Sequence, residues 1–156
     1  MTPAINLLKK SAIKYQVHEY EHDPACSSYG LEAAQKTGVS DQQVFKTLVI
    51  KLDNNQLAVG IIPVSEKLSM KLMAKACGAK KAVMADSIEV ERSTGYVLGG
   101  VSPLGQKKRL KTVVNSSAET YPSIYVSAGR RGLEIELAPA DLLMLSNGVF
   151  AEICQE

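Results

Sequence analysis

The stretch at residues 45–64, FKTLVIKLDNNQLAVGIIPV, decides the fold class of this chain. Two apolar runs rich in β-branched residues, FKTLVIKL and QLAVGIIPV, flank Asp53-Asn54-Asn55, which are residue types that favour turns. The pattern predicts a hairpin whose side chains alternate between the two faces of a sheet. The architecture must therefore be built around a β-sheet.

The rest of the chain predicts further strands and short helices in an irregular order. Alternating runs favour strands, while a capping residue or a proline marks a helix start and a glycine marks its end. We expect strands at 15–20, 82–84, 112–114, 124–128, 133–137 and near 149–153, and helices after Thr2-Pro3, at 31–37, 66–77 and 86–95, and from Pro139. Because no regular strand–helix–strand repeat appears, we predict one α+β domain over residues 1–156, with a mixed, curved sheet flanked by short helices.

The composition disfavours several classes of protein. A hydrophobic content of 46% and a charged content of 22% are ordinary for a globular domain, and no stretch approaches the ~20 apolar residues of a membrane span. The N-terminus, MTPAINLLKK, lacks the basic-then-apolar order of a signal peptide. The cysteines, Cys26, Cys77 and Cys154, are odd in number and form no CxxC pair, which disfavours disulfides and zinc and favours a reducing cytoplasm. His18 and His22 fall on a strand and a loop, so we expect no metal site there.

Cations cluster locally, although the net charge of +2 is too small to mark a nucleic-acid-binding protein. The segment 94–111, TGYVLGGVSPLGQKKRLK, sets two adjacent glycines, a Ser-Pro pair and a further glycine before four cations with no acid among them. Because glycine lets a backbone approach a ligand closely, this segment predicts a backbone-built pocket that receives the end of a polyanion. For this run, and for Lys80-Lys81 and Arg130-Arg131, a solvated charged face is the alternative.

Polar residues on predicted strands have two explanations each. Lys46 shares a strand face with aliphatic residues, so its ammonium either reaches solvent at a strand edge or is held in a ligand pocket. Glu134 and Glu136 share one face and could perform acid–base chemistry or form the wet face of an edge strand. Ser127, just before a turn, could bind a ligand or cap that turn. The chain has no GxSxG elbow, no P-loop and no cysteine nucleophile motif, so an enzyme here would rely on backbone donors and on groups brought by its substrate.

Four stretches resemble one family of proteins. TGYVLGGVSPLGQKKR, VFKTLVI, YVSAGRRGLEIEL and the opening MTPAINLLKK resemble the YbaK/EbsC family, free-standing relatives of the editing domain inserted in bacterial prolyl-tRNA synthetase. The resemblance covers nearly the whole chain and is strongest to the Cys-tRNA(Pro) deacylase branch. It implies a barrel-like β-structure surrounded by helices. It also implies a cytoplasmic trans-editing enzyme without metal or cofactor, whose partners are prolyl-tRNA synthetase and tRNA(Pro) mischarged with cysteine.

The resemblance also implies which residues form the site. It places the family's essential lysine on Lys46 and its acid on Glu134, where close relatives often have aspartate. The implied pocket loop is Gly99, Gly100, Val101 and Ser102; the further substrate-binding residues are Tyr20, Thr47, Ser127 and Gly129; and the tRNA-binding cations are Lys107, Lys108 and Arg109.

The mechanism implied by the resemblance needs no nucleophile from the protein. The thiol of the mischarged cysteine attacks its own ester carbonyl, which gives a cyclic thiolactone and frees the tRNA end. Backbone amides of the pocket loop steady the oxyanion, and Lys46 holds the phosphate or ribose of the terminal adenosine. The alternatives are a deacylase for alanyl or seryl esters, a non-catalytic module that binds tRNA or synthetase, and a general phosphate-binding protein.

Overall fold

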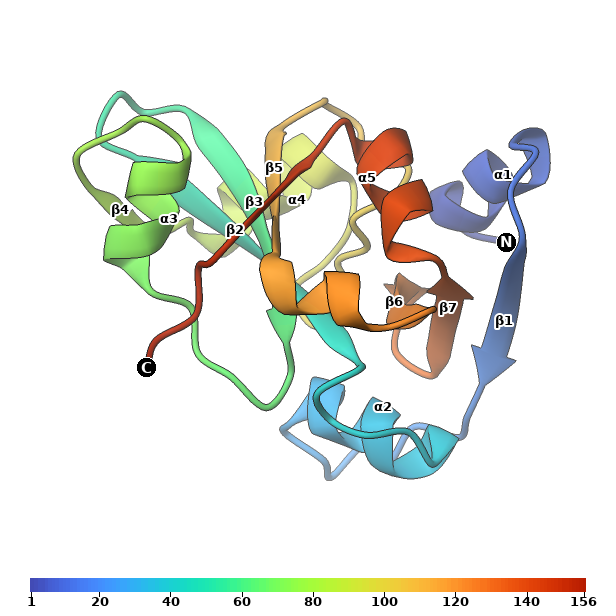
Figure 1. Cartoon of the computed structure of the whole chain (residues 1–156). Helices are drawn as coiled ribbons and strands as arrows, with labels where there is room; N and C mark the ends of the chain where they lie inside the picture. The colour runs from blue at the N-terminus through green and yellow to red at the C-terminus, as the bar shows by residue number, and fades with distance from the viewer.

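A computed structural model describes the whole chain, Met1–Glu156. Helices and strands are mixed along it, as expected for an α+β protein (Figure 1). The helices are α1 (Pro3–Lys10), α2 (Tyr29–Thr37), α3 (Met70–Ala76), α4 (Ser87–Thr94) and α5 (Pro139–Ser146), with a 3₁₀ helix, η1, at Ser116–Thr120. The strands are β1 (Tyr15–Glu19), β2 (Phe45–Leu52), β3 (Leu57–Pro63), β4 (Ala82–Met84), β5 (Lys111–Asn115), β6 (Ile124–Arg130), β7 (Leu133–Leu137) and β8 (Val149–Ala151). None of these helices combines the length and the apolar character that crossing a membrane requires.

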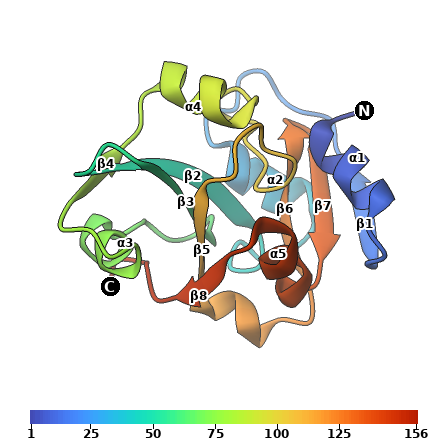
Figure 2. The ribbon, with the colours of Figure 1, turned by 90° about the horizontal axis from the view of Figure 1, so that it is seen from above.

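The strands form two sheets rather than one. A five-stranded sheet has the order β4-β2-β3-β5-β8, and a three-stranded sheet has the order β1-β7-β6. Figure 2 shows the two sheets beside each other with the helices around them. The larger sheet is mixed, because β5 pairs in parallel with both β3 and β8. An isolated bridge between Val44 and Tyr125 links the sheets, which do not close, so "barrel-like" is only a loose description.

Two apolar cores lie on opposite faces of the five-stranded sheet. Neighbouring residues of β3 divide between them: Ile61 belongs to the first core and Ile62 to the second, and both are fully buried. The first core joins the two sheets and includes Leu8 of α1. The second is covered by Met73 of α3 and by Ile153 of the C-terminal segment, which runs past β5 toward α3 in Figure 1. Both faces of the central hairpin are therefore buried.

Most of the predicted elements are confirmed, and local capping explains their ends. The β2–β3 hairpin has the predicted antiparallel pairing, and Asp86 Oδ1 accepts a hydrogen bond from Glu89 N at 2.8 Å at the start of α4. The predicted helix at 66–77 was wrong at its start. Ser69 Oγ accepts a hydrogen bond from Leu72 N at 3.1 Å, so Ser69 is the cap and α3 begins at Met70. The 3₁₀ helix η1 was not predicted.

Candidate active site

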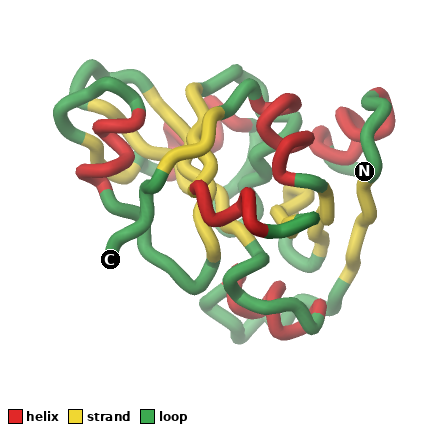
Figure 3. The backbone as a smooth tube through the Cα atoms, in the orientation of Figure 1, coloured by secondary structure: helices red, strands yellow, loops and turns green.

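A cavity of about 350 Å³ opens where α2, the start of β2, the β6–β7 turn and the loop before β5 meet. This loop is part of the long green segment between α4 and β5 in Figure 3. β4 pairs with β2 only at Ile50–Leu52. The first half of β2 is therefore paired with β3 on one edge, and its other edge borders the cavity. Its wall contains these residues predicted from the sequence: Tyr20, Lys46, Thr47, Gly99, Val101, Ser127 and Glu134.

Glu134, rather than Glu136, faces this cavity. β7 lies between β1 and β6, so the interpretation of these acids as the wet face of an edge strand was wrong. Glu134 is only 6% exposed, its carboxyl has no hydrogen-bond partner in the protein, and burial raises the pKa of this carboxyl to about 8. Glu136 instead accepts hydrogen bonds from Ser123 Oγ at 2.6 Å and His18 Nε2 at 2.9 Å, and the Ser123 bond is the main reason that its pKa is lowered. Near neutral pH, Glu134 is a protonated carboxyl in the cavity wall.

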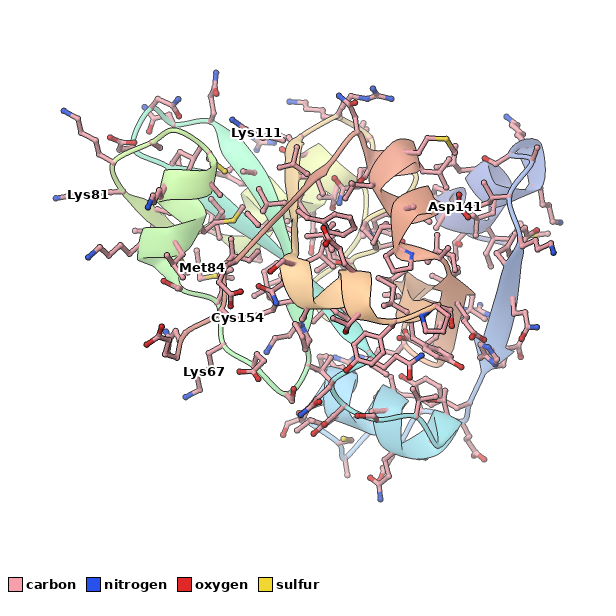
Figure 4. All side chains as sticks on the ribbon, viewed as in Figure 1. Lys67, Lys81, Met84, Lys111, Asp141 and Cys154 are labelled. Carbon is pink, nitrogen blue, oxygen red and sulfur yellow. The ribbon has the colours of Figure 1, made fainter.

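Lys46 is half-buried near the start of β2, opposite Ile62 of β3. Burial lowers the pKa of its ammonium, and the ionisable groups whose charges act on it are Cys154 and Lys67. Figure 4 shows Lys67 and Cys154 below α3, on the side of the molecule away from α1 and β1. No carboxylate pairs with Lys46, so its ammonium is available to a ligand.

Hydroxyl groups supply further polar contacts in the cavity. Thr47 Oγ1 is buried and has no hydrogen-bond partner in the protein. Burial raises the pKa of the Tyr20 phenol, which also lies close enough to Glu134 for their charges to interact. Ser127 Oγ accepts a hydrogen bond from Gly129 N at 3.1 Å, so this hydroxyl caps the turn and also lines the cavity. Gly129 itself supports the turn and does not line the cavity.

The glycine-rich loop places only some of its residues at the cavity. Gly99 has φ +90°, and a Cβ there would lie 2.6 Å from the Tyr29 ring, so only glycine fits. Gly100 donates its N–H to Val97 O at 3.0 Å, whereas the N–H groups of Gly99 and Val101 have no partner in the protein. Ser102 is fully buried, and its Oγ accepts a hydrogen bond from Leu104 N at 3.2 Å. Leu98, Gly99 and Val101 line the cavity, whereas Gly100 and Ser102 do not.

The predicted tRNA-binding cations lie elsewhere on the surface. Lys107 and Lys108 are tied to the end of α4 through their backbone N–H groups, and their side chains are exposed. Lys108 and Arg109 border a separate depression near α1 and α5. The cations that line the cavity are instead Lys46, Arg130 and Arg131. The sequence showed Arg130 and Arg131 as a basic pair in a turn, but it held no signal that linked this turn to the glycine-rich loop.

The chemistry available in the cavity is hydrogen bonding rather than attack by the protein. Neither a histidine nor a cysteine lines it, so its serine and threonine hydroxyls have no imidazole beside them to act as a base. No group of three or more His, Cys, Asp or Glu residues could hold a metal ion. What the wall offers is a protonated carboxyl, an ammonium, hydroxyls and unpaired backbone amides.

Comparison with known proteins shows which family the chain resembles. A family model of the aminoacyl-tRNA editing domain matches residues 23–145. The chain is 39% identical over 155 residues to EbsC of Enterococcus faecalis, a candidate Cys-tRNA(Pro)/Cys-tRNA(Cys) deacylase, with 97% of this chain and 92% of that protein covered. It is 25% identical over 146 residues to the multifunctional Ser/Thr-tRNA deacylase ProXp-y of Escherichia coli, with 91% and 85% covered.

A solved structure shares the fold and agrees with these sequence matches. The crystal structure of a candidate trans-editing enzyme for prolyl-tRNA synthetase superposes with a TM-score of 0.80 at 24% identity, covering 91% of this chain and 87% of that one. The family match over residues 23–145 and the identity to EbsC confirm the resemblance drawn from the sequence, and the solved structure confirms the fold. The chain therefore belongs to the aminoacyl-tRNA editing domain family and is an aminoacyl-tRNA deacylase.

Proposed function

We propose that this deacylase clears cysteine mischarged onto tRNA(Pro), working alongside prolyl-tRNA synthetase. The observation that carries the proposal is a cavity whose wall holds hydrogen-bond donors but no nucleophile paired with an imidazole base. A cysteinyl ester brings its own nucleophile into such a cavity. The 39% identity to EbsC, a candidate deacylase of cysteinyl esters, supports the same substrate.

The proposed reaction is an intramolecular thiol attack. Water takes the proton of the substrate thiol, and the sulfur bonds to the ester carbonyl carbon. The bond from that carbon to the ribose oxygen then breaks, and the ribose oxygen takes up a proton from a group in the cavity wall, which solvent reprotonates. The products are a cyclic thiolactone, which water hydrolyses, and tRNA with a free terminal hydroxyl. The cavity's task is to hold sulfur and carbonyl in a reactive geometry, a proximity effect. The free N–H groups of Gly99 and Val101 donate to the oxyanion, and one such donor is worth on the order of a hundredfold in rate.

The side chains in the wall then have distinct tasks. Lys46 orients the ribose end of the ester, and the hydroxyl groups of Tyr20, Thr47 and Ser127 bind the polar groups of the aminoacylated nucleotide. Glu134 is protonated near neutral pH because its pKa is about 8. Its carboxyl therefore donates a proton to the departing ribose oxygen, which is the task of a general acid.

The test is a comparison of Cys-, Ser- and Ala-tRNA(Pro) as substrates. We expect rapid loss of the cysteinyl ester, a detectable thiolactone, and survival of the alanyl ester, because alanine has no nucleophilic side chain. Cleavage of Ala-tRNA(Pro) while Cys-tRNA(Pro) survives would refute the proposal. The 25% identity to ProXp-y favours a second candidate, the deacylation of seryl or threonyl esters, and faster loss of Ser-tRNA(Pro) would support it.

A further inference from the structure

A chain of polar contacts runs from a buried carboxylate to the mouth of the cavity. Glu32 of α2 is only 4% exposed; its Oε1 lies 2.6 Å from His22 Nδ1, and its Oε2 accepts a hydrogen bond from Asp23 N at 2.9 Å. On the other side of the imidazole, Arg131 Nη1 lies 2.9 Å from His22 Nε2. The guanidinium carbon of Arg131 is 3.3 Å from the centroid of the Tyr29 ring. A surface arginine is therefore held by a carboxylate, an imidazole and an aromatic ring.

The hydrogen-bond chemistry of arginine fixes the direction of these contacts. A guanidinium can only donate, so His22 Nε2 accepts a hydrogen bond from Arg131. His22 Nδ1–H then donates to Glu32. Burial raises the pKa of Glu32, but the hydrogen bonds from His22 and from Asp23 N outweigh it, so the pKa is lowered on balance. Glu32 is thus an ionised anchor that orients His22, and His22 orients Arg131.

The same contacts leave most of the guanidinium free. One face of Arg131 stacks on Tyr29 and one Nη1–H is used by His22, but no carboxylate forms an ion pair with it. Arg131 lines the cavity beside the glycine-rich loop: a Cβ on Gly99 would lie 3.3 Å from Arg131 Nε. Stacking on a ring occupies the face of a guanidinium and leaves its edge for planar recognition of an oxyanion. The structure holds a full positive charge in a preset orientation at the cavity mouth.

We propose that Arg131 binds the phosphate group on the 5′ side of the aminoacylated nucleotide, and that Glu32, His22 and Tyr29 position it. The proposal rests on the proposed function, because an esterified amino acid has no free carboxylate and the nearest anion of such a substrate is this phosphate. The exposed cations Lys107–Arg109 do not line the cavity and cannot make this contact. Lys46, whose ionisable neighbours are Lys67 and Cys154, is then left to the ribose and the ester.

The test is the binding of adenosine 5′-monophosphate compared with adenosine, measured by NMR titration of the full chain. A hydrogen bond to a charged group is worth about tenfold or more in affinity. We expect the wild-type protein to prefer the monophosphate by about that factor, and Arg131→Gln to lose the preference while its affinity for adenosine is kept. Arg92→Gln, which removes an exposed arginine on α4, is the matched control and should keep the preference.

Two further measurements separate binding from positioning and from folding. His22→Phe keeps a ring but removes both hydrogen bonds, so it should reduce the preference for the monophosphate although His22 contacts no ligand. Thermal melting of each variant shows whether it folds. If Arg131→Gln does not fold, the affinity of His22→Phe for the two ligands supplies an independent test of the phosphate site. If a folded His22→Phe protein prefers adenosine 5′-monophosphate over adenosine as strongly as the wild type does, the imidazole does not position Arg131.

The outcomes are distinct from those of the deacylation assay. A preference that persists in Arg131→Gln, or one that is absent from the wild-type protein, would overturn the phosphate site. If Arg131→Gln loses the preference but the wild-type protein cleaves no Cys-tRNA(Pro), the phosphate site stands and the proposed substrate fails. If both hold, Arg131→Gln should raise KM for Cys-tRNA(Pro) about tenfold, with kcat less affected.

Discussion

Replacement of Glu134 by Gln should make the protein more stable at neutral pH and less active. The carboxyl is 6% exposed and unpaired, and its pKa is raised from an ordinary 4.5 to about 8. Between these two values the unfolded chain has released the proton while the folded chain keeps it. The folded state must therefore either hold a proton that solvent would take or bury a charge, and both cost stability.

The sign and size of the effect follow from this shift. Because the folded state binds more protons than the unfolded state between pH 4.5 and about 8, the free energy of unfolding falls as pH rises through this window. Each pH unit costs about 1.4 kcal/mol, so the penalty at pH 7 is about 3 kcal/mol, relative to a pH below 4.5. A neutral amide escapes this penalty, so the gain of Glu134→Gln should be near zero below 4.5 and grow to about 3 kcal/mol at pH 7.

Urea unfolding across this pH window measures the effect. Glu136→Gln is the matched control, because the pKa of Glu136 is lowered, chiefly by the hydrogen bond from Ser123. An acid whose pKa is lowered in the folded state stabilises the protein above its unfolded pKa, and this contribution is lost as pH falls. Removing the acid should therefore destabilise the protein at neutral pH. Deacylation of Cys-tRNA(Pro) by Glu134→Gln should fall, since an amide cannot act as a general acid. A Glu134→Gln protein that is no more stable at pH 7 than at low pH, relative to wild type, would refute the buried, protonated carboxyl.

Three other predictions follow from the geometry. Lys46→Ala should abolish deacylation without changing the circular dichroism spectrum, and unchanged turnover would remove Lys46 from the site. Neutralising Lys107–Arg109 should raise KM more than it lowers kcat and should weaken the salt dependence of tRNA binding, because we expect these exposed cations to contact phosphates of the tRNA rather than the reacting ester. Equal tRNA affinity of the wild-type protein at low and high salt would contradict this. Gly99→Ala should lower kcat by tenfold or more, since φ +90° and a Cβ 2.6 Å from the Tyr29 ring force the loop to move; a rate equal to wild type would show that this loop donates nothing to the oxyanion.

The sequence predicted the elements whose causes are local. Alternation and turn residues predicted the hairpin of β2 and β3, and capping side chains predicted where α4 begins. The same local signals identified a glycine-rich loop and the cations after it. They failed for the start of α3, which was predicted at residue 66. The helix begins at Met70 because Ser69 caps it, although the apolar pattern extends further back. Strand alternation singled out Lys46, Glu134 and Glu136 but left two explanations for each; resemblance to a family supplied the substrate and the choice of Lys46 and Glu134 as site residues.

Only the tertiary structure decided how these residues meet. Glu134 is buried in the wall of a cavity built by segments that are distant in sequence, and exclusion of solvent there raises its pKa. Arg131 reaches the mouth of the cavity because its guanidinium stacks on Tyr29 and touches His22, residues about a hundred positions earlier in the chain. The burial, electrostatic environment and orientation of a side chain all depend on neighbours that are distant in sequence. Local patterns therefore determined the elements and the residue types, whereas packing determined which of those residues form the site.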